Sequence, residues 1–218
     1  MEITYIAHSC FKIKGKDITL VIDPYEPDQT GYKLPKLSAD IVLVSHDHFD
    51  HNYTAGVEDT KLLINSAGEY EMQGVYVTGV PTYHDDNLGA ERGNNTMYLI
   101  EIDDFTLLHC GDLGHELKPE TIELLSEVDI LFIPVGGKYT INPKMASNVI
   151  SSIEPRVVVP MHYQTKNPNK LTKDLKPLNE FLEELGEEEN GSTDKYKIGK
   201  RTELPEELEI IVIQPTNG

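Results

Sequence analysis

The most informative segment of this sequence is Ser45-His46-Asp47-His48-Phe49-Asp50-His51. It directly follows Ala39-Asp40-Ile41-Val42-Leu43-Val44, an apolar run with the length and β-branched content of a buried strand. Side chains at the end of such a strand are held by rigid backbone and face a cleft. We therefore expect a site for chemistry at this position.

Within this stretch the chain presents three of its eight histidines, together with two aspartates. Neutral imidazole nitrogen and carboxylate oxygen are preferred ligands of divalent zinc, manganese and iron. The alternative is a polar turn in which Asp50 caps a helix and the histidines are solvated, which does not account for such dense spacing. The motif predicts one half of a metal site.

Three further segments carry the same residue types at predicted strand ends. His84 follows the apolar run 75–81, Asp112 follows 106–110, and His162 follows 157–160. Because strand ends that are scattered in sequence can meet at one edge of a fold, we expect these side chains to converge on the first motif.

Alternating and continuous apolar runs predict the remaining organisation. An antiparallel opening followed by strands that alternate with helices is typical of a layered α/β domain. The expected strands are 3–7, 11–14, 18–22, 39–44, 61–64, 75–81, 96–102, 106–110, 129–134, 157–160 and 208–213; the expected helices are 52–57, 119–126, 143–153 and 171–185; the expected loops are 24–35, 87–95 and 187–194.

Composition limits the classes of protein to consider. A chain of 218 residues suits one domain over 1–218. A formal charge of -18 argues against a general nucleic-acid-binding surface. Cys10 and Cys110, each inside an apolar segment, predict free thiols in a reducing compartment. With no leader-like N-terminus and no apolar run of membrane-spanning length, we expect a cytoplasmic protein without a membrane segment.

The first motif also carries a family resemblance. His46, His48, Asp50 and His51 match the His-x-His-x-Asp-His signature of the metallo-β-lactamase-fold superfamily. The segments 6–9, 22–24, 109–112, 134–137 and 160–163 resemble the small metal-dependent hydrolases around ascorbate phosphate lactonase, over residues 1–165. This resemblance implies an α/β metallo-β-lactamase fold: a four-layer αβ/βα sandwich of two mixed sheets with outer helices.

The resemblance also implies a ligand set for two divalent metal ions. The first ion would be held by His46, His48 and His84, the second by Asp50, His51 and His162, and Asp112 would bridge them. Such a pair of ions shares a water and lowers its pKa towards neutrality. Zinc is the expected metal, with manganese and iron left open because the same ligands suit all three.

Three other residues are weaker candidates. His8 and His109 are expected to act beside Asp50 in the catalytic group, although His109 also fits a role in orienting a ligand. Asp23 is expected to orient a ligand or contact substrate, and both His8 and Asp23 have a plain alternative as turn or cap residues.

Two side chains complete the candidate list. Tyr163 follows His162 and could donate to a developing oxyanion, or simply pack beside the cleft. His115 could touch substrate or serve as a solvated residue at the start of a helix.

These features favour a metal-dependent hydrolase that uses a metal-bound hydroxide to cleave an ester, lactone or phosphoester of a small, anionic substrate. Three alternatives stay open: a nuclease or RNA-processing phosphodiesterase with the same two metals, a di-iron oxidoreductase, and a non-catalytic binding protein braced by metal. His48 argues against the di-iron class, whose members carry Glu there. Assembly into a homo-oligomer is also left open.

Overall fold

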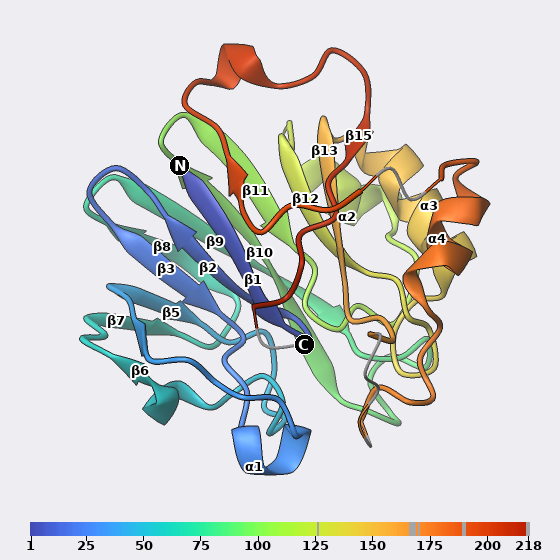
Figure 1. The fold of residues 1–218 in the computed structure, drawn as a ribbon, viewed down its shortest axis with the longest axis horizontal. Helices are drawn as coiled ribbons and strands as arrows, with labels where there is room; N and C mark the ends of the chain where they lie inside the picture. The colour runs from blue at the N-terminus through green and yellow to red at the C-terminus, as the bar shows by residue number, and fades with distance from the viewer. Residues whose placement is uncertain (126, 166–168, 170, 189–190, 217–218) are drawn as a thin grey trace.

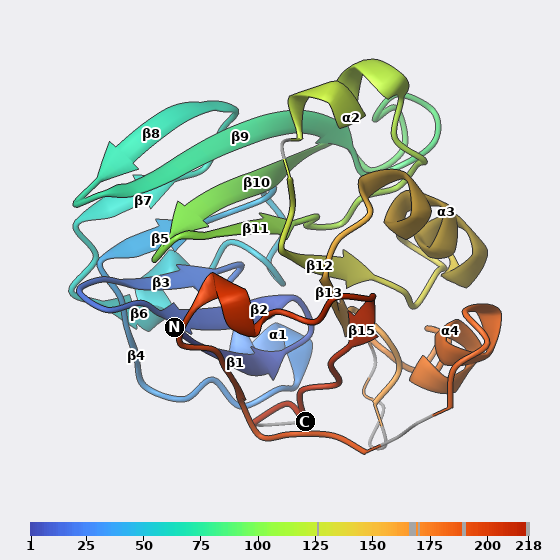
Figure 2. The same cartoon turned by 90° about the horizontal axis from the view of Figure 1, so that it is seen from above.

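A computed structural model describes residues 1–125, 127–165, 169, 171–188 and 191–216. Two β-sheets stack face to face, and the longer helices lie on the outer side of the second sheet (Figures 1 and 2). The first sheet has the strand order β14-β1-β2-β3-β5-β7. Its strands are β1 (Glu2–Ala7), β2 (Cys10–Lys14), β3 (Thr19–Ile22), β5 (Ile41–Leu43), β7 (Leu62–Ile64) and β14 (Tyr196–Lys197).

The second sheet has the order β15-β13-β12-β11-β10-β9-β8. Its strands are β8 (Gly68–Met72), β9 (Val75–Tyr83), β10 (Asn94–Ile102), β11 (Phe105–His109), β12 (Ile130–Pro134), β13 (Val157–Met161) and β15 (Glu209–Ile210). Strands β8 to β11 pair antiparallel, whereas β11, β12, β13 and β15 pair in parallel. Both sheets are therefore mixed, as expected.

The two central parallel strands of the second sheet are buried on both faces. Every residue of β12 and β13 is buried, which explains their unbroken apolar sequences. One hydrophobic cluster joins them to the first sheet through side chains such as Phe11 and Leu20. A single domain requires a core that both sheets share. We therefore propose that residues 1–218 form one domain.

Three helices cover the outer face of the second sheet: α2 (Pro119–Leu124), α3 (Pro143–Ile153) and α4 (Leu178–Glu184) (Figure 2). Helix α3 begins where the Asn142 side chain accepts a hydrogen bond from Met145 N at 3.0 Å. Its buried face includes Ala146, Val149 and Ile150, which belong to the shared core. The helix boundaries match the 3.6-residue apolar spacing of the sequence.

The outer face of the first sheet is covered differently. A second hydrophobic cluster packs Val21 and Val42 of that sheet against Tyr25, Tyr32 and other residues of the segment 25–39. This segment contains only the short helix α1 (Pro27–Thr30) and the strand β4 (Leu37–Ser38), which pairs with β6 (Val57–Glu58). The two stacked mixed sheets that the resemblance implies are present, but loops and these short elements replace long helices on this side.

Several sequence expectations differ from the structure in their extent. Strand β8 was missed because its sequence is polar and largely exposed. The expected helix 52–57 is the single 3₁₀ turn η1 (Thr54–Gly56), and the helix expected over 171–185 shortens to α4, which begins directly after Pro177. Residue 126 of the expected helix 119–126 and residues 189–190 of the expected loop lie outside the described residues. Among the residues described, no helix has the length and apolar character needed to cross a bilayer.

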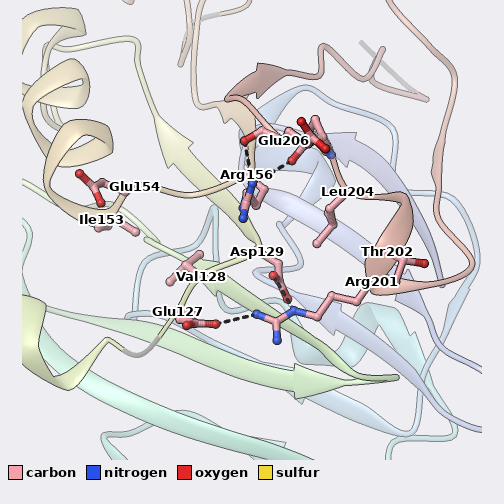
Figure 3. A pocket seen from close by; sticks show the side chains of 11 residues that line it. Glu127, Val128, Asp129, Ile153, Glu154, Arg156, Arg201, Thr202, Leu204 and Glu206 are labelled. Atoms are coloured by element: carbon pink, nitrogen blue, oxygen red, sulfur yellow. Dashed lines mark hydrogen bonds and ion pairs between the residues drawn. The ribbon is translucent and has the colours of Figure 1, made fainter.

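Arg201, Asp129 and Glu127 form an ion-pair cluster, which we call the clamp. It lies at the end of the second sheet opposite the histidine motif. Arg201, in the 3₁₀ turn η2 (Arg201–Glu203), donates from Nε to Asp129 Oδ1 at 3.0 Å and from Nη2 to Glu127 Oε2 at 3.1 Å (Figure 3). Asp129 is buried, and its other oxygen accepts from Thr106 N at 2.9 Å. Asp129 and Arg201 border a cavity of about 530 Å³, and their contact joins the turn η2 to the residue directly before β12.

Replacing this guanidinium tests the clamp. Arg201→Gln leaves the buried Asp129 carboxylate without its cationic partner, so we expect the free energy of unfolding in urea to fall by about 1 kcal/mol. Lys200→Gln is the matched control, because Lys200 is exposed and its substitution removes the same charge. Equal stability of the two variants would contradict a stabilising role for Arg201.

Candidate metal centre

The side chains singled out in the sequence gather where strands of both sheets end. In the first sheet, β1, β3 and β5 lead to His8, Asp23 and the motif Ser45–His51; in the second, β9, β11 and β13 lead to His84, Asp112 and His162. All of these strands run out at one edge of the sandwich. The expected convergence of scattered strand ends is therefore present.

Three of these strand ends turn sharply through a left-handed backbone. The φ angles of His8, Asp23 and His162 are 59°, 49° and 52°, a region that residues other than glycine rarely adopt. The turns are held in place, because the His8 carbonyl accepts from His162 N at 2.9 Å and from Tyr5 Oη at 2.6 Å. Strain of this kind persists only where surrounding contacts enforce it, and it aims both histidines at the centre.

Asp112 is the hub of the cluster. Its Oδ2 atom lies 3.3 Å from His51 Nε2, 3.2 Å from His84 Nε2 and 3.3 Å from His162 Nε2. Burial alone would raise the pKa of this carboxyl group, but the imidazoles of His162 and His51 outweigh burial and hold the pKa well below its usual range. Asp112 is therefore a carboxylate with imidazoles from three separate strand ends around one oxygen.

His46, His48 and His84 form a second grouping beside this hub. Each offers a ring nitrogen, and these three atoms lie within 4.8 Å of one another. Burial lowers the pKa of His46 to about 2 and also lowers that of His48, so both rings are neutral. Neutral imidazoles at this separation have the chemistry of a cation ligand set.

The Asp23 carboxylate sets which nitrogen of two rings faces the centre. Asp23 accepts from Ser45 N and Ser45 Oγ, both at 2.7 Å, and from His51 Nδ1 at 2.9 Å. Since the Ser45 hydroxyl donates to Asp23, it accepts from His46 Nδ1, 2.9 Å away. Both His46 and His51 thus carry a proton on Nδ1 and turn Nε2 inward.

The inward atoms provide a test of whether these residues fit a metal ion. His46 Nε2, His51 Nε2 and Asp112 Oδ1 are buried without a hydrogen-bond partner. Burial lowers the pKa of His51, but the carboxylates of Asp112, Asp50 and Asp23 raise it well above its usual value. The centre therefore favours positive charge at His51 Nε2, and a divalent cation satisfies both the charge and the orphaned atoms.

Asp50 and His8 lie together on the side of Asp112 that carries His51 and His162. His8 Nε2 is 3.1 Å from Asp50 Oδ2, and His51 Nε2 is 3.8 Å from the same oxygen. His8 also offers a ring nitrogen within 4.8 Å of those of His51 and His162. The structure thus brings His8 as close to the centre as the expected ligands.

Asn95 holds the turn that carries the hub, and the sequence analysis missed it. Its amide donates to Thr82 Oγ1 at 2.8 Å and to Cys110 O at 2.9 Å, and accepts from Asp112 N at 3.0 Å. Gly111 has φ of 55°, and a Cβ there would collide with Asn95 and Ser45. The sequence placed Asn95 in a loop, and only its position before a strand hinted at a fixed backbone.

His109 is buried, but it does not face the centre. Its Nδ1 accepts from Gly111 N at 3.1 Å, and its Nε2 donates to Ser9 O at 3.0 Å. Both nitrogens are engaged with backbone groups, so the geometry does not support the catalytic role expected for His109. It positions the Gly111 turn.

The two remaining candidates lie at the margin. His115 is partly exposed; its Nε2 accepts from Tyr83 N at 3.2 Å and its Nδ1 donates to Glu116 O at 2.8 Å, so both ring nitrogens are engaged with backbone groups. This geometry gives no support to a substrate contact. Tyr163 is buried next to His162, and its ring centroid lies 6.5 Å from that of Tyr5.

Comparisons with known proteins agree on the family. The model of the family described as "Beta-lactamase superfamily domain" matches residues 2–162. A "UPF0173 metal-dependent hydrolase" of Thermococcus onnurineus is 31% identical over 196 residues, covering 77% of this chain and 87% of the relative. Another of that name, from Methanopyrus kandleri, is 28% identical over 217 residues, covering 85% and 93%.

A solved structure extends the agreement to three dimensions. A crystal structure from Thermotoga maritima, described as a suggested zinc-dependent hydrolase of the metallo-beta-lactamase superfamily, superposes with a TM-score of 0.76 at 32% identity. The match covers 97% of each chain.

Weakening the support of His51 and His46 should weaken metal binding. We expect Ser45→Ala and Asp23→Asn to lower zinc affinity roughly 10- to 100-fold, because the rings lose the partners that fix their orientation. Competition with a chromogenic chelator measures this effect. Asp17→Asn, an exposed change of the same kind, should bind zinc like the unaltered protein. Unchanged affinity in both Ser45→Ala and Asp23→Asn would contradict the orienting role.

The environment of His109 predicts a pH dependence of stability. Burial lowers the pKa of His109 in the folded chain, so its neutral ring stabilises the fold above pH 6.5 and this contribution is lost as the pH falls below that value. His109→Asn keeps an acceptor for Gly111 N and does not titrate. Its melting temperature should therefore fall less between pH 7 and pH 5, measured after chelator treatment, and a slope equal to that of the unaltered chain would refute this account.

Proposed function

Because the chain belongs to the metallo-β-lactamase superfamily and matches its UPF0173 metal-dependent hydrolases, we propose that it holds two divalent cations and hydrolyses an ester, lactone or phosphoester of a small molecule. Like these relatives, the chain is a metal-dependent hydrolase. This favours an enzyme over a non-catalytic binding protein that metal only stabilises. The observation that carries the proposal is the Asp112 carboxylate, enclosed by imidazoles from three strand ends.

We assign the ligands by their grouping. His46, His48 and His84 would hold one cation, and Asp50, His51 and His162 the other. Asp112 would serve both, since the rings around its Oδ2 atom belong to both sets. Zinc is our choice of metal, because the ligands are mainly neutral imidazoles and the Thermotoga maritima relative carries a zinc description.

When bound, such a pair of cations would lower the pKa of water and polarise the substrate group under attack. Burial would raise the pKa of Asp50, but His51 and His8 outweigh it and keep Asp50 ionised. Burial lowers the pKa of His8 to about 4, so the ring is neutral and its Nε2–H donates to Asp50 Oδ2. Asp50 Oδ1 then is the atom that accepts a proton from the attacking water.

His8 in this scheme is a positioning residue for Asp50. Its backbone is fixed by His162 N and Tyr5 Oη, and its ring fixes one carboxylate oxygen. Tyr163 and Asp23 support the centre from outside: Tyr163 packs behind it, and Asp23 orients His51. The lactonase branch suggested by sequence stays a prediction, as does the identity of the substrate.

The proposal is tested on zinc-loaded protein with a nitrophenyl phosphodiester, a lactone and a β-lactam. We expect chelator-sensitive turnover of at least one class. His48→Ala should lower it by more than the roughly 100-fold that loss of a ligand-orienting partner costs. Asp17→Asn is the control, because this carboxylate is exposed in the turn between β2 and β3 and lines neither the centre nor the cavity beside it.

Two results would contradict the proposal. One is turnover by His48→Ala equal to that of Asp17→Asn, with both variants folded. The other is turnover that survives complete removal of metal by chelator.

A further inference from the structure

A cavity of about 650 Å³ opens directly beside His46 and His48. Residues at the ends of β5 and β7 line it from the first sheet, and residues of β9, β10 and the loop between them line it from the second. More than half of its lining residues carry hydroxyl or amide side chains, but its accessible surface is about as apolar as it is polar. Such a lining suits a small molecule that has both polar and apolar parts.

Arg92 is the cationic side chain among the residues that line this cavity. A guanidinium at this place is notable in a chain with a formal charge of -18. The cavity also has one carboxylate, Asp47, which already accepts a hydrogen bond from Asn52. The Arg92 guanidinium is therefore a positively charged hydrogen-bond donor next to the proposed ligands.

The backbone of Arg92 is fixed relative to the metal centre. The Asp85 carboxylate accepts four backbone hydrogen bonds, from Asn87, Gly89, Glu91 and Arg92, at 2.8 to 3.0 Å. The next residue, Gly93, accepts from His84 N at 3.0 Å through its carbonyl. The expected loop 87–95 is thus folded around the Asp85 side chain. Its Gly93 carbonyl joins the segment that carries Arg92 to the proposed ligand His84.

The Arg92 guanidinium itself is not committed to a strong partner. Within the described part of the chain it has one ion pair, from Nη1 to Glu91 Oε2 at 3.6 Å, and its side chain is 35% exposed. Exposed pairs of this length contribute little and are readily exchanged. The exposed amides of Asn65 and Asn94 also border the cavity, so donors lie on both of its walls.

We propose that Arg92 binds an anionic group, a carboxylate or a phosphate, of a small polar substrate in this cavity. A guanidinium recognises either oxyanion through paired N–H donors. The scissile bond of that substrate would then lie toward His46, His48 and His84. The inference rests on the proposed function for the reaction, but the anion site itself is a binding property that can be measured without turnover.

The test compares Arg92→Gln with Lys14→Gln in zinc-loaded protein. Lys14 is exposed at the far end of β2, so its loss changes the net charge equally without touching the cavity. Titration calorimetry with inorganic phosphate gives the equilibrium readout. We expect Arg92→Gln to raise the Kd about tenfold, and Lys14→Gln to leave it within about twofold.

A kinetic arm separates carboxylate from phosphate recognition. The ratio of kcat/KM for 4-nitrophenyl hemisuccinate over the neutral 4-nitrophenyl acetate should fall about tenfold in Arg92→Gln. Glu91→Gln, which frees the guanidinium, should keep or raise that ratio. A fall in phosphate affinity without a change in this ratio would assign the site to phosphate.

An ester ratio that is unchanged in Arg92→Gln would overturn the inference if the unaltered protein also fails to bind phosphate, or if the two variants bind phosphate with equal Kd values. These results are distinct from failure of the proposed function. That failure would appear as no metal-dependent turnover by any variant, even where phosphate binding still depends on Arg92.

Discussion

Burial of negative charge among imidazoles is the constraint on which this structure depends. Asp23, Asp50 and Asp112 are all buried, and each faces at least one histidine ring. Taking a carboxylate out of water is costly unless positive charge or hydrogen-bond donors replace the lost hydration. Here the donors are ring nitrogens, and the three carboxylates together favour positive charge at His51. A divalent cation would neutralise this buried negative charge.

The fold places the ends of strands, rather than loops, around these buried carboxylates. His8 and His162 turn through a left-handed backbone and are joined by a hydrogen bond between the two sheets. On the other side, Asn95 fixes the turn at Gly111 that presents Asp112. Because these contacts are made by backbone at the ends of buried strands, the side chains are organised before any cation arrives.

The sequence predicted the parts of the fold that follow local rules. The unbroken apolar run predicted β13, and the periodic apolar spacing predicted α3. The dense motif at Ser45–His51 predicted the position of the metal centre. What could not be read were interactions that join distant segments. Asn95 looks like any loop residue until Asp112 N and Cys110 O are placed beside it. His109 was expected to act beside Asp50 or to orient a ligand, whereas its two nitrogens are engaged with backbone groups.

Anomalous diffraction at the zinc edge, from crystals of the zinc-loaded protein, would show how many cations the centre holds and where they lie. We expect two peaks that flank the Asp112 carboxylate, one beside His46, His48 and His84 and the other beside His51 and His162. A single peak, or none at full zinc loading, would contradict a centre of two cations bridged by Asp112.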